Sequence, residues 1–267
     1  MSNPTIKALF FDIDGTLVSF QTHRIPQSTV DALERAKKNG VKVYISTGRP
    51  KMIITNLGQI EHLIDGYITT NGARCFVGDH TVCQRPISRA DVNKVVAASD
   101  RDGYPVIVVG EKHLAIHNLT PIVEKIFVEG LGVDALDFKV RLEDLAGEDV
   151  LQLTPFCSEA QEAALMPTLD NCTSGRWHPA FTDITAGDAD KGKGLHAMAE
   201  YLGLEIGETM AFGDGGNDLS IIKEAGIGVA MGNAGDNVKA IADYVTSSVD
   251  NHFLASLLPA VPSRTKN

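Results

Sequence analysis

Short apolar runs alternate with amphipathic, helix-like segments in the N-terminal part of the chain. The apolar runs are Ile6 to Phe11, Val41 to Ser46 and Tyr67 to Thr69. Helical patterns occupy Ser28 to Asn39 and a segment that starts at Pro50. This alternation predicts parallel strands that are joined by crossover helices.

The same alternation returns in the C-terminal part of the chain. The pattern predicts, in order, a helix at Gly194 to Leu202, a strand at Met210 to Phe212, a helix at Asn217 to Ala225, and strands at Ile227 to Ala230 and Tyr244 to Thr246. The two ends of the chain therefore predict one kind of architecture.

The middle of the chain has a different pattern. Val106 to Val109 and Leu114 to His117 are two apolar runs separated by Gly-Glu-Lys-His, which favours an antiparallel hairpin. Helical patterns occur at Ala90 to Ser99 and Ser158 to Met166. We interpret this region as a separate α+β module.

The predicted fold class is therefore α/β. Residues 1–82 and 182–267 form a doubly wound, Rossmann-like core with a parallel sheet, and residues 83–181 form an inserted α+β cap domain. A chain of 267 residues is long enough for two modest domains. A composition of 43% hydrophobic and 22% charged residues is ordinary for a globular enzyme.

The charge and the hydropathy pattern restrict the partners of the protein. A formal charge of −10 argues against general binding to nucleic acid or to an anionic membrane. An anionic substrate must then be attracted by a local cation. The sequence shows neither a secretory signal pattern nor a long apolar run. We expect a cytoplasmic protein, a monomer or weak dimer, which acts on a small phosphorylated metabolite.

The cysteines are widely scattered and have no C-x-x-C spacing, which speaks against a zinc site or a disulfide framework. We interpret all of them as buried, small apolar residues. They are Cys75, Cys83, Cys157 and Cys172.

Polar clusters occur at four places next to predicted strands or helices. In parallel strands, the positions after each strand meet at one edge of the sheet, where such folds bind ligands. We expect the four clusters to converge there. They are Asp12-Ile13-Asp14-Gly15-Thr16, Ser46-Thr47-Gly48-Arg49, Lys191, and Gly213-Asp214-Gly215-Gly216-Asn217-Asp218.

This convergence would place four acids in a small volume, namely Asp12, Asp14, Asp214 and Asp218. Like charges about 4 Å apart repel by roughly 4 kcal/mol per pair at an effective dielectric constant near 20. A cation is therefore required, and hard carboxylate oxygens favour Mg²⁺. Lys191 would supply a second positive charge, suited to a phosphoryl oxygen. The amides of the glycine turn and the neutral donors Thr47 and Asn217 would complete a phosphate cradle.

With a phosphoryl group in this cradle, Asp12 is the candidate nucleophile, because a carboxylate can attack phosphorus and form an aspartyl-phosphate. Asp14 could protonate the departing alkoxide and then activate water. Gly15 permits a sharp reversal of the chain just after the strand.

The four clusters resemble, in order, the four motifs of the haloacid dehalogenase superfamily of phosphohydrolases. The insertion after Asn71 and before Lys191 is similar to the C2B-type cap of the Cof-like sugar-phosphate phosphatases. The resemblance extends over nearly the whole chain and includes the segment Gly228 to Ala234.

The resemblance implies a Mg²⁺-dependent phosphatase that hydrolyses small phosphate monoesters, such as hexose or pentose phosphates, through an aspartyl-phosphate. It implies that Asp12 is the nucleophile and Asp14 the acid and base. The implied Mg²⁺ ligands are the Asp12 side chain, the Asp14 backbone carbonyl and Asp214, with Asp218 assisting through water. The implied phosphate-binding groups are the Ile13 amide, Thr47, Gly48, Lys191 and Asn217.

Several alternatives stay open. Lys193 competes with Lys191 for the third motif, although the spacing of the following residues favours Lys191. Asn71 could hold a turn or touch substrate. Trp177 is more often a packing residue than a sugar contact. The same core could also serve a phosphotransferase, a phosphomutase or a sugar-phosphate-binding regulator without turnover.

Overall fold

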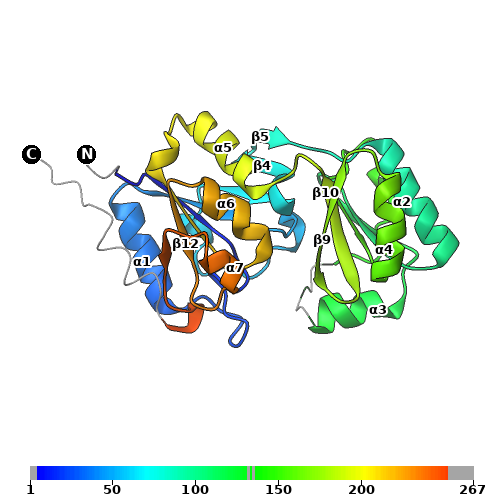
Figure 1. Cartoon of the computed structure of the whole chain (residues 1–267), viewed down its shortest axis with the longest axis horizontal. Coiled ribbons are helices and arrows are strands. Elements are labelled where there is room, and N and C mark those ends of the chain that lie inside the picture. Colours follow the sequence, from blue (N-terminus) through cyan, green and yellow to red (C-terminus); the bar gives the residue numbers. More distant parts are fainter. Residues whose placement is uncertain (1–4, 131–132, 134–135, 252–267) are drawn as a thin grey trace, which may run out of the picture. The chain divides into compact units, whose positions relative to one another are not determined.

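The computed structural model describes residues 5–130, 133 and 136–251. The chain divides into two compact units, drawn in Figure 1. Unit 1 comprises Met1–Gly48, Asn56–Cys83 and Asp190–Asn267, and unit 2 comprises Arg49–Thr55 and Gln84–Ala189.

Unit 1 is built on an eight-stranded sheet with the order β13-β12-β11-β1-β2-β3-β4-β5. All pairings from β13 to β3 are parallel, whereas β3 and β4 are antiparallel. The strands are β1 (Ala8–Phe11), β2 (Lys42–Ser46), β3 (Gly66–Thr69), β4 (Arg74–Val77), β5 (His80–Gln84), β11 (Thr209–Gly213), β12 (Ile227–Ala230) and β13 (Tyr244–Val245).

Helices cover this sheet, as the alternating pattern predicts. The helix α1 packs against β2, while α5 and α6 contact each other and the neighbouring strands. The helices of unit 1 are α1 (Gln27–Lys38), α5 (Lys191–Leu202), α6 (Leu219–Glu224) and α7 (Asp236–Lys239). The predicted doubly wound α/β core with a parallel sheet is thus confirmed.

The central strand β1 is apolar because both of its faces are covered. All four of its residues are buried, as expected for a strand in the middle of a parallel sheet. The ring of Phe10 stacks on that of Tyr44 at 5.0 Å, and the ring of Phe11 stacks on that of Phe212 at 4.5 Å. Burying each such side chain contributes about 1.5–3 kcal/mol.

The strand order reverses next to β1. From β1 the chain continues to β2 on one side, whereas β11 joins β1 on the other side and leads to β12. Parallel open sheets bind ligands at this switch point, beyond the carboxyl ends of the strands. The residues that come directly after β1 and β11 therefore occupy the favoured place for a site.

Unit 2 is built on a five-stranded sheet with the order β7-β6-β8-β10-β9. Each neighbouring pair is antiparallel, which includes the predicted hairpin of β6 and β7. The strands are β6 (Val106–Val109), β7 (Leu114–His117), β8 (Gln152–Pro155), β9 (Cys172–His178) and β10 (Phe181–Ala186).

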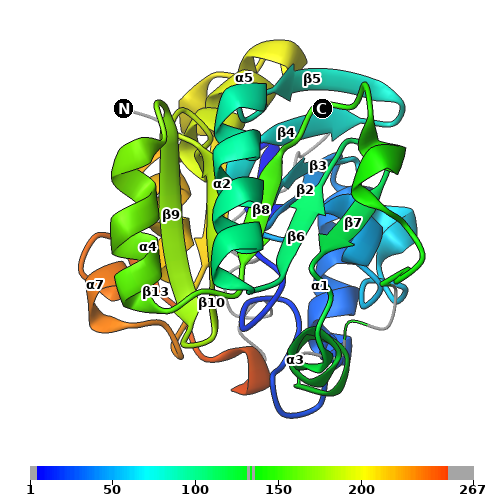
Figure 2. The ribbon, with the colours of Figure 1, turned by 90° about the vertical axis from the view of Figure 1, so that its right-hand side faces the viewer.

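Figure 2 shows the helices α2 (Arg89–Asp102) and α4 (Glu159–Leu165) lying over one face of this sheet. On that face, Val106, Leu153 and Ile184 join a core cluster with residues of both helices. A second cluster with three phenylalanines forms around Phe181, between this sheet and α3 (Pro121–Val123) with the adjoining π-helix Glu124–Gly130.

Two predictions about local structure are wrong. The helix expected from Pro50 is a short 3₁₀ turn, Lys51–Ile53. The β-branched run from Ile53 to Thr55 disfavours a helix, and the Ile53 side chain packs in the second core cluster of unit 2. Unit 2 also ends later than residue 181, because β10 completes its sheet.

The interpretation of the cysteines holds only in part. All four are free thiols, and Cys75 and Cys157 are buried. Cys83 and Cys172 are half-exposed, since both lie on edge strands, β5 and β9, where one side of the strand is open.

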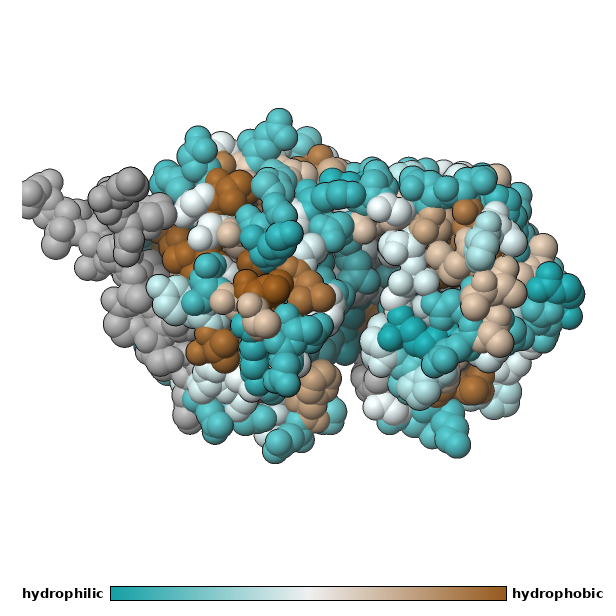
Figure 3. Space-filling model, viewed as in Figure 1, coloured by the Kyte–Doolittle hydropathy of each residue, from teal (hydrophilic) through white to brown (hydrophobic). Residues whose placement is uncertain are grey.

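The visible surface of each unit is mainly hydrophilic, with scattered apolar patches (Figure 3). Within the described residues, no helix combines the length and the apolar character that crossing a bilayer requires.

Candidate active site

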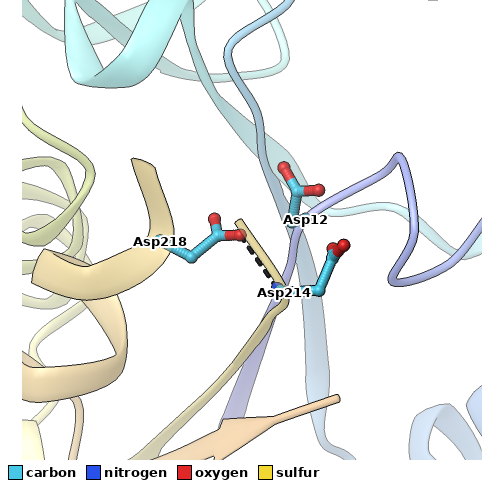
Figure 4. A group of neighbouring side chains, drawn as sticks. All are labelled: Asp12, Asp214 and Asp218. Atoms are coloured by element: carbon cyan, nitrogen blue, oxygen red, sulfur yellow. Dashed lines mark hydrogen bonds between the residues drawn. The ribbon is translucent and has the colours of Figure 1, made fainter. Parts of the chain in front are cut away.

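Three acids meet beyond the carboxyl ends of β1 and β11. Asp12 comes directly after β1, and its backbone amide donates to the Phe212 carbonyl at 3.0 Å. Asp214 comes directly after β11, and Asp218 ends the short turn Gly216–Asp218. Each acid offers one carboxylate oxygen, and these three oxygens lie within 4.8 Å of one another (Figure 4). The structure thus brings the first and fourth motifs together.

The Lys191 ammonium lies inside this acidic cluster. Lys191 is the first residue of α5 and is only 1% exposed. Its Nζ donates to Asp12 Oδ1 at 2.8 Å and to Asp218 Oδ1 at 2.5 Å. Lys193 is exposed on the same helix, and its backbone amide donates to the N-cap residue Asp190. Lys191 is therefore the lysine that meets the acids.

Asp214 and Asp218 have different surroundings. The Asp218 Oδ2 accepts the backbone amides of Asp214 and Gly215, both at 3.0 Å, while its Oδ1 accepts Lys191. Both oxygens of Asp218 are thus already engaged. The Asp214 carboxylate instead accepts from two neutral groups, the Thr16 hydroxyl at 2.8 Å and the Asn233 amide at 3.3 Å.

Crowding and burial destabilise the ionised acids. Burial raises the pKa of Asp12 well above its ordinary value; Lys191 opposes this rise, and the charges of Asp218, Asp214 and Asp14 add to it. Burial likewise raises the pKa of Asp214 to about 6, although the Thr16 hydrogen bond opposes the rise. The site therefore holds more negative charge than Lys191 can balance.

Lys191 itself stays protonated. Burial alone would lower the pKa of its ammonium, but the charges of Asp12 and Asp218 and their hydrogen bonds raise it above the ordinary value. A permanent positive charge is therefore fixed beside the Asp12 carboxylate.

The acidic cluster fits a hard divalent cation. Its converging donors are carboxylate oxygens, without imidazole or thiolate, and this donor set suits Mg²⁺ better than zinc or copper. The oxygens of Asp218 accept from the Lys191 ammonium and from two backbone amides, whereas those of Asp214 accept from two neutral side chains, so the charge of Asp214 is less compensated and more available to a cation. A second positive charge would also relieve the crowding of the acids.

A tight turn after β1 carries Asp14 and Gly15. Asp14 is half-buried, and Gly15 has a φ of +85°, which favours glycine. A Cβ at Gly15 would collide with the Asp214 carboxylate and lie 2.7 Å from the ring of Phe20. Gly15 is therefore required both by the turn and by the close approach of Asp214.

Asn233 ties this turn to the fourth motif, although the sequence pattern indicated no role for it. Its Nδ2 donates to the Gly15 carbonyl at 2.8 Å and to Asp214 Oδ2 at 3.3 Å. The only signal in the sequence was its position within the Gly228 to Ala234 segment, which resembles the family.

A second group of polar residues gathers at the ends of β2 and β3. The Asn71 backbone amide donates to the Thr47 carbonyl at 3.1 Å, and the Asn217 side chain donates to Asn71 Oδ1, also at 3.1 Å. A Cβ on Gly48 would lie 3.1–3.4 Å from the side-chain amides of Asn71 and Asn217. The second and fourth motifs are thus adjacent, and Asn71 joins them.

Asn71 belongs to a strained run of three left-handed residues. The φ angles are +49° at Thr70, +52° at Asn71 and +88° at Gly72. A β-branched residue at positive φ is an outlier, and such strain persists only where the surroundings impose it. A Cβ at Gly72 would collide with the backbone of Asp190, the residue before Lys191. This run therefore contacts the second, third and fourth motifs.

The other predicted residues lie in contrasting environments. Ile13 is fully buried and Thr47 is 1% exposed, whereas Asn217 is exposed. Arg49 belongs to unit 2, where its guanidinium donates to the Ile53 carbonyl.

Known proteins resemble this chain over almost its whole length. YkrA of Bacillus subtilis, which is named as a phosphatase, is 32% identical over 254 residues, covering 93% of this chain and 95% of YkrA. YcsE of the same organism, a 5-amino-6-(5-phospho-D-ribitylamino)uracil phosphatase, is 28% identical over 266 residues, covering 91% of this chain and 90% of YcsE.

A solved structure also resembles this chain over almost its whole length. The sugar phosphatase BT4131, of HAD subclass IIB, is 46% identical with a TM-score of 0.87, covering 95% of this chain and 98% of that chain. The sequence model of the haloacid dehalogenase-like hydrolases matches residues 9–258. The resemblance drawn from the four motifs is confirmed, and the chain belongs to the haloacid dehalogenase-like hydrolases.

Proposed function

We propose that this protein is a Mg²⁺-dependent phosphatase that hydrolyses small sugar phosphates through an aspartyl-phosphate on Asp12. The observation that carries the proposal is the buried Lys191 ammonium, held between Asp12 and Asp218 beside Asp214. Together with the cation that the excess acids require, this ammonium would attract a dianionic phosphoryl group despite the net charge of −10. The phosphatase names of the relatives support the same reaction class.

Asp12 acts as the nucleophile. Its Oδ1 accepts the Lys191 hydrogen bond, which leaves Oδ2 to attack phosphorus. The new Oδ2–P bond forms as the P–O bond to the sugar breaks, and Asp14 gives its proton to the departing alkoxide. Water then attacks the aspartyl-phosphate, Asp14 takes the water proton, and inorganic phosphate and the Asp12 carboxylate are released.

Mg²⁺ would be held by the Asp12 side chain, the Asp14 backbone carbonyl and Asp214, with Asp218 assisting through water. When bound, it neutralises charge on the phosphoryl oxygens. The Lys191 ammonium would supply a second positive charge beside Asp12. The backbone amides of Asp214 and Gly215 hold the carboxylate of Asp218, which in turn orients Lys191.

The remaining groups orient the phosphoryl group and the substrate. The Ile13 amide, Thr47, Gly48 and Asn217 would donate hydrogen bonds to phosphoryl oxygens, and Asn71 holds Asn217 in place. We assign catalysis to unit 1 and the choice of the leaving group to unit 2, the cap. In this assignment, every residue that takes part in making or breaking a bond belongs to unit 1.

Phosphate release from a panel of phosphorylated metabolites tests the proposal. Hexose and pentose phosphates should release phosphate with Mg²⁺ and should not do so after chelation. Hydrolysis that persists after exhaustive chelation would refute the Mg²⁺ assignment. Activity confined to nucleotides or phosphopeptides would refute the substrate class. Loss of substrate faster than phosphate release would instead indicate transfer to another hydroxyl.

Rapid quenching tests the covalent step. With phosphorus-labelled p-nitrophenyl phosphate, whose leaving group departs without a proton, an Asp14→Asn variant should accumulate an acid-stable, hydroxylamine-sensitive phosphoprotein, because its intermediate is hydrolysed slowly. The double variant with Asp12→Asn should carry no label. Label on the protein with Asp12→Asn would show that another residue is the nucleophile.

A further inference from the structure

One face of the unit 2 sheet carries a polar cluster that the proposed mechanism does not use. Side chains alternate between the two faces along a strand. Leu153 and Ile184 join the core cluster under α2 and α4, so Thr154 and Asp183 project from the opposite face. Trp177 of β9 reaches the same face, because its indole bonds to Asp183.

Asp183 is the centre of this polar cluster. It is 9% exposed, and its carboxylate accepts the Thr154 hydroxyl at 2.7 Å on Oδ1 and the Trp177 indole N–H at 2.8 Å on Oδ2. No cationic side chain of the described chain pairs with it. The register of β9 and β10 shifts between Phe181 and Asp183, and an irregularity of this kind changes the direction of the side chains next to it.

Trp177 forms a fixed aromatic surface next to this acid. It is the only tryptophan of the chain and is 60% exposed. The hydrogen bond to Asp183 and the edge contact with the Phe181 ring, at 4.8 Å between centroids, fix its orientation. An exposed indole that is held rigidly offers a flat apolar face at little entropic cost on binding.

The polar cluster also contains an acceptor that has no donor. Gln152 is 4% exposed and donates from its Nε2 to the Thr154 hydroxyl at 3.2 Å. Its Oε1 is buried and has no hydrogen-bond partner within the part of the chain that the structure describes. An unsatisfied buried carbonyl destabilises the fold, and a hydrogen bond from a ligand hydroxyl would relieve this.

Open space lies beside the polar cluster. Gly175 of β9 pairs directly with Asp183, and a Cβ built on it would meet nothing within 4 Å. Its φ is not positive, so a side chain at this position carries no backbone strain. The position can therefore be filled experimentally without distorting the strand.

We propose that Gln152, Thr154, Asp183 and Trp177 form a binding site for the polyol part of a neutral sugar or sugar alcohol. The Asp183 carboxylate and Gln152 Oε1 accept from hydroxyl groups, the Thr154 hydroxyl adds a polar contact, and the C–H face of the sugar packs on Trp177. This inference deepens the proposed function, on which it rests for its link to turnover, by naming the group that the cap recognises.

The chemistry of the cluster favours a polyol over an ammonium ligand. A polyol hydroxyl both donates and accepts, which suits a mixture of carboxylate, amide and hydroxyl groups. Asp183 is the single charge in the cluster, and three neutral side chains, Thr154, Trp177 and Gln152, already stabilise it by hydrogen bonds. An ammonium group would use Asp183 but would leave Gln152 Oε1 as the sole further acceptor.

The sole tryptophan provides a direct binding assay that needs no turnover. Titration with D-ribitol and D-glucitol, which carry no phosphate, should change the Trp177 fluorescence in a saturable manner, at millimolar concentrations. Asp183→Asn should weaken this binding at least 10-fold, and Gly175→Leu should abolish it. Gly175→Ala, which fills less of the space, is the matched control and should bind within 3-fold of the wild type.

Two outcomes would overturn the inference. One is the absence of a saturable response to both polyols in the wild type. The other is a response to choline or methylammonium in place of the polyols, which would identify a cation site.

Kinetics separate this inference from the proposed function. For a hexose 6-phosphate, Gly175→Leu should lower kcat/KM at least 10-fold, mainly through KM, whereas hydrolysis of p-nitrophenyl phosphate should change less than 2-fold. Equal losses on both substrates would refute a polyol site. If the wild type hydrolyses neither substrate but binds polyols, the proposed function fails and the site stands.

Discussion

Replacement of Asp214 by Asn is expected to stabilise the metal-free protein and to abolish its response to Mg²⁺. The Asp214 carboxylate is largely buried among other acids, and among the described residues its side-chain hydrogen-bond donors are the neutral groups of Thr16 and Asn233. An amide can keep both contacts, because its oxygen can accept from Asn233 while its N–H donates to the Thr16 oxygen. The substitution therefore removes a disfavoured charge and retains the hydrogen bonds.

The raised pKa sets the magnitude of this effect. Folding raises the pKa of Asp214 from 3.8 to about 6, so the ionised carboxylate destabilises the folded protein. One unit corresponds to about 1.4 kcal/mol, so this penalty is at most about 3 kcal/mol, and solvent screening of the partly exposed group reduces it to roughly 1–3 kcal/mol. The penalty is fully present above about pH 6 and disappears as the pH falls below 3.8.

Thermal unfolding in a chelator measures this effect. Asp214→Asn should have a higher Tm than the wild type at pH 7.5, by about 2–4 °C per kcal/mol, and the difference should shrink toward pH 4. Mg²⁺ should raise the Tm of the wild type but not that of the variant. Asp79→Asn, on the exposed turn between β4 and β5, makes the same change of charge and should do neither.

Two results would refute this expectation. A chelated Asp214→Asn protein that is less stable than the wild type at pH 7.5 would mean that the carboxylate is not a disfavoured charge. An Asp214→Asn protein that Mg²⁺ still stabilises would place the cation elsewhere.

Three further predictions concern single side chains. Lys191→Met should abolish phosphate release and destabilise the protein by about 3–5 kcal/mol, because it leaves buried acids without their cation, whereas Lys193→Met should leave turnover unchanged. Asn71→Gly removes the contact to Asn217, while glycine still tolerates the left-handed backbone at this position. Phosphate-release kinetics should show a roughly 10-fold loss in kcat/KM with little change in Tm, and an equal loss of stability and activity would contradict a positioning role. Burial opposes the shift, but hydrogen bonds, that from Lys37 foremost, lower the pKa of Asp65, so this carboxylate stabilises the fold at neutral pH. Denaturation should show that Asp65→Asn is destabilising at pH 7 and progressively less so as the pH falls below 3.8.

Much of the fold could be predicted from the pattern of apolar residues. The run ending at Phe11 is a buried central strand, and the switch to a hairpin at Val106 marked unit 2. The pattern failed where tertiary contacts decide. Ile53 is pulled into the aromatic core of unit 2, and β10 belongs to the unit 2 sheet although it lies beyond the expected boundary.

The candidate site, like the fold, could be predicted from the sequence only in part. The motif residues could be named from the sequence because parallel strands bring their carboxyl ends to one edge. Asn233 and the left-handed run at Thr70 could not be assigned roles, since the sequence does not show which loops touch. The division of labour between Asp214 and Asp218 also needed the structure, because it depends on which oxygen accepts which backbone amide.

The place of β1 between β2 and β11 also affects biosynthesis. Thr16 and Asp214, which bond to each other, are 198 positions apart in the sequence. At about 5–20 residues per second, a ribosome needs roughly 10–40 s to add the second partner after the first. During this interval one edge of β1 lacks its neighbour and is exposed to aggregation. The nascent chain therefore cannot complete its site until Asp214 has emerged.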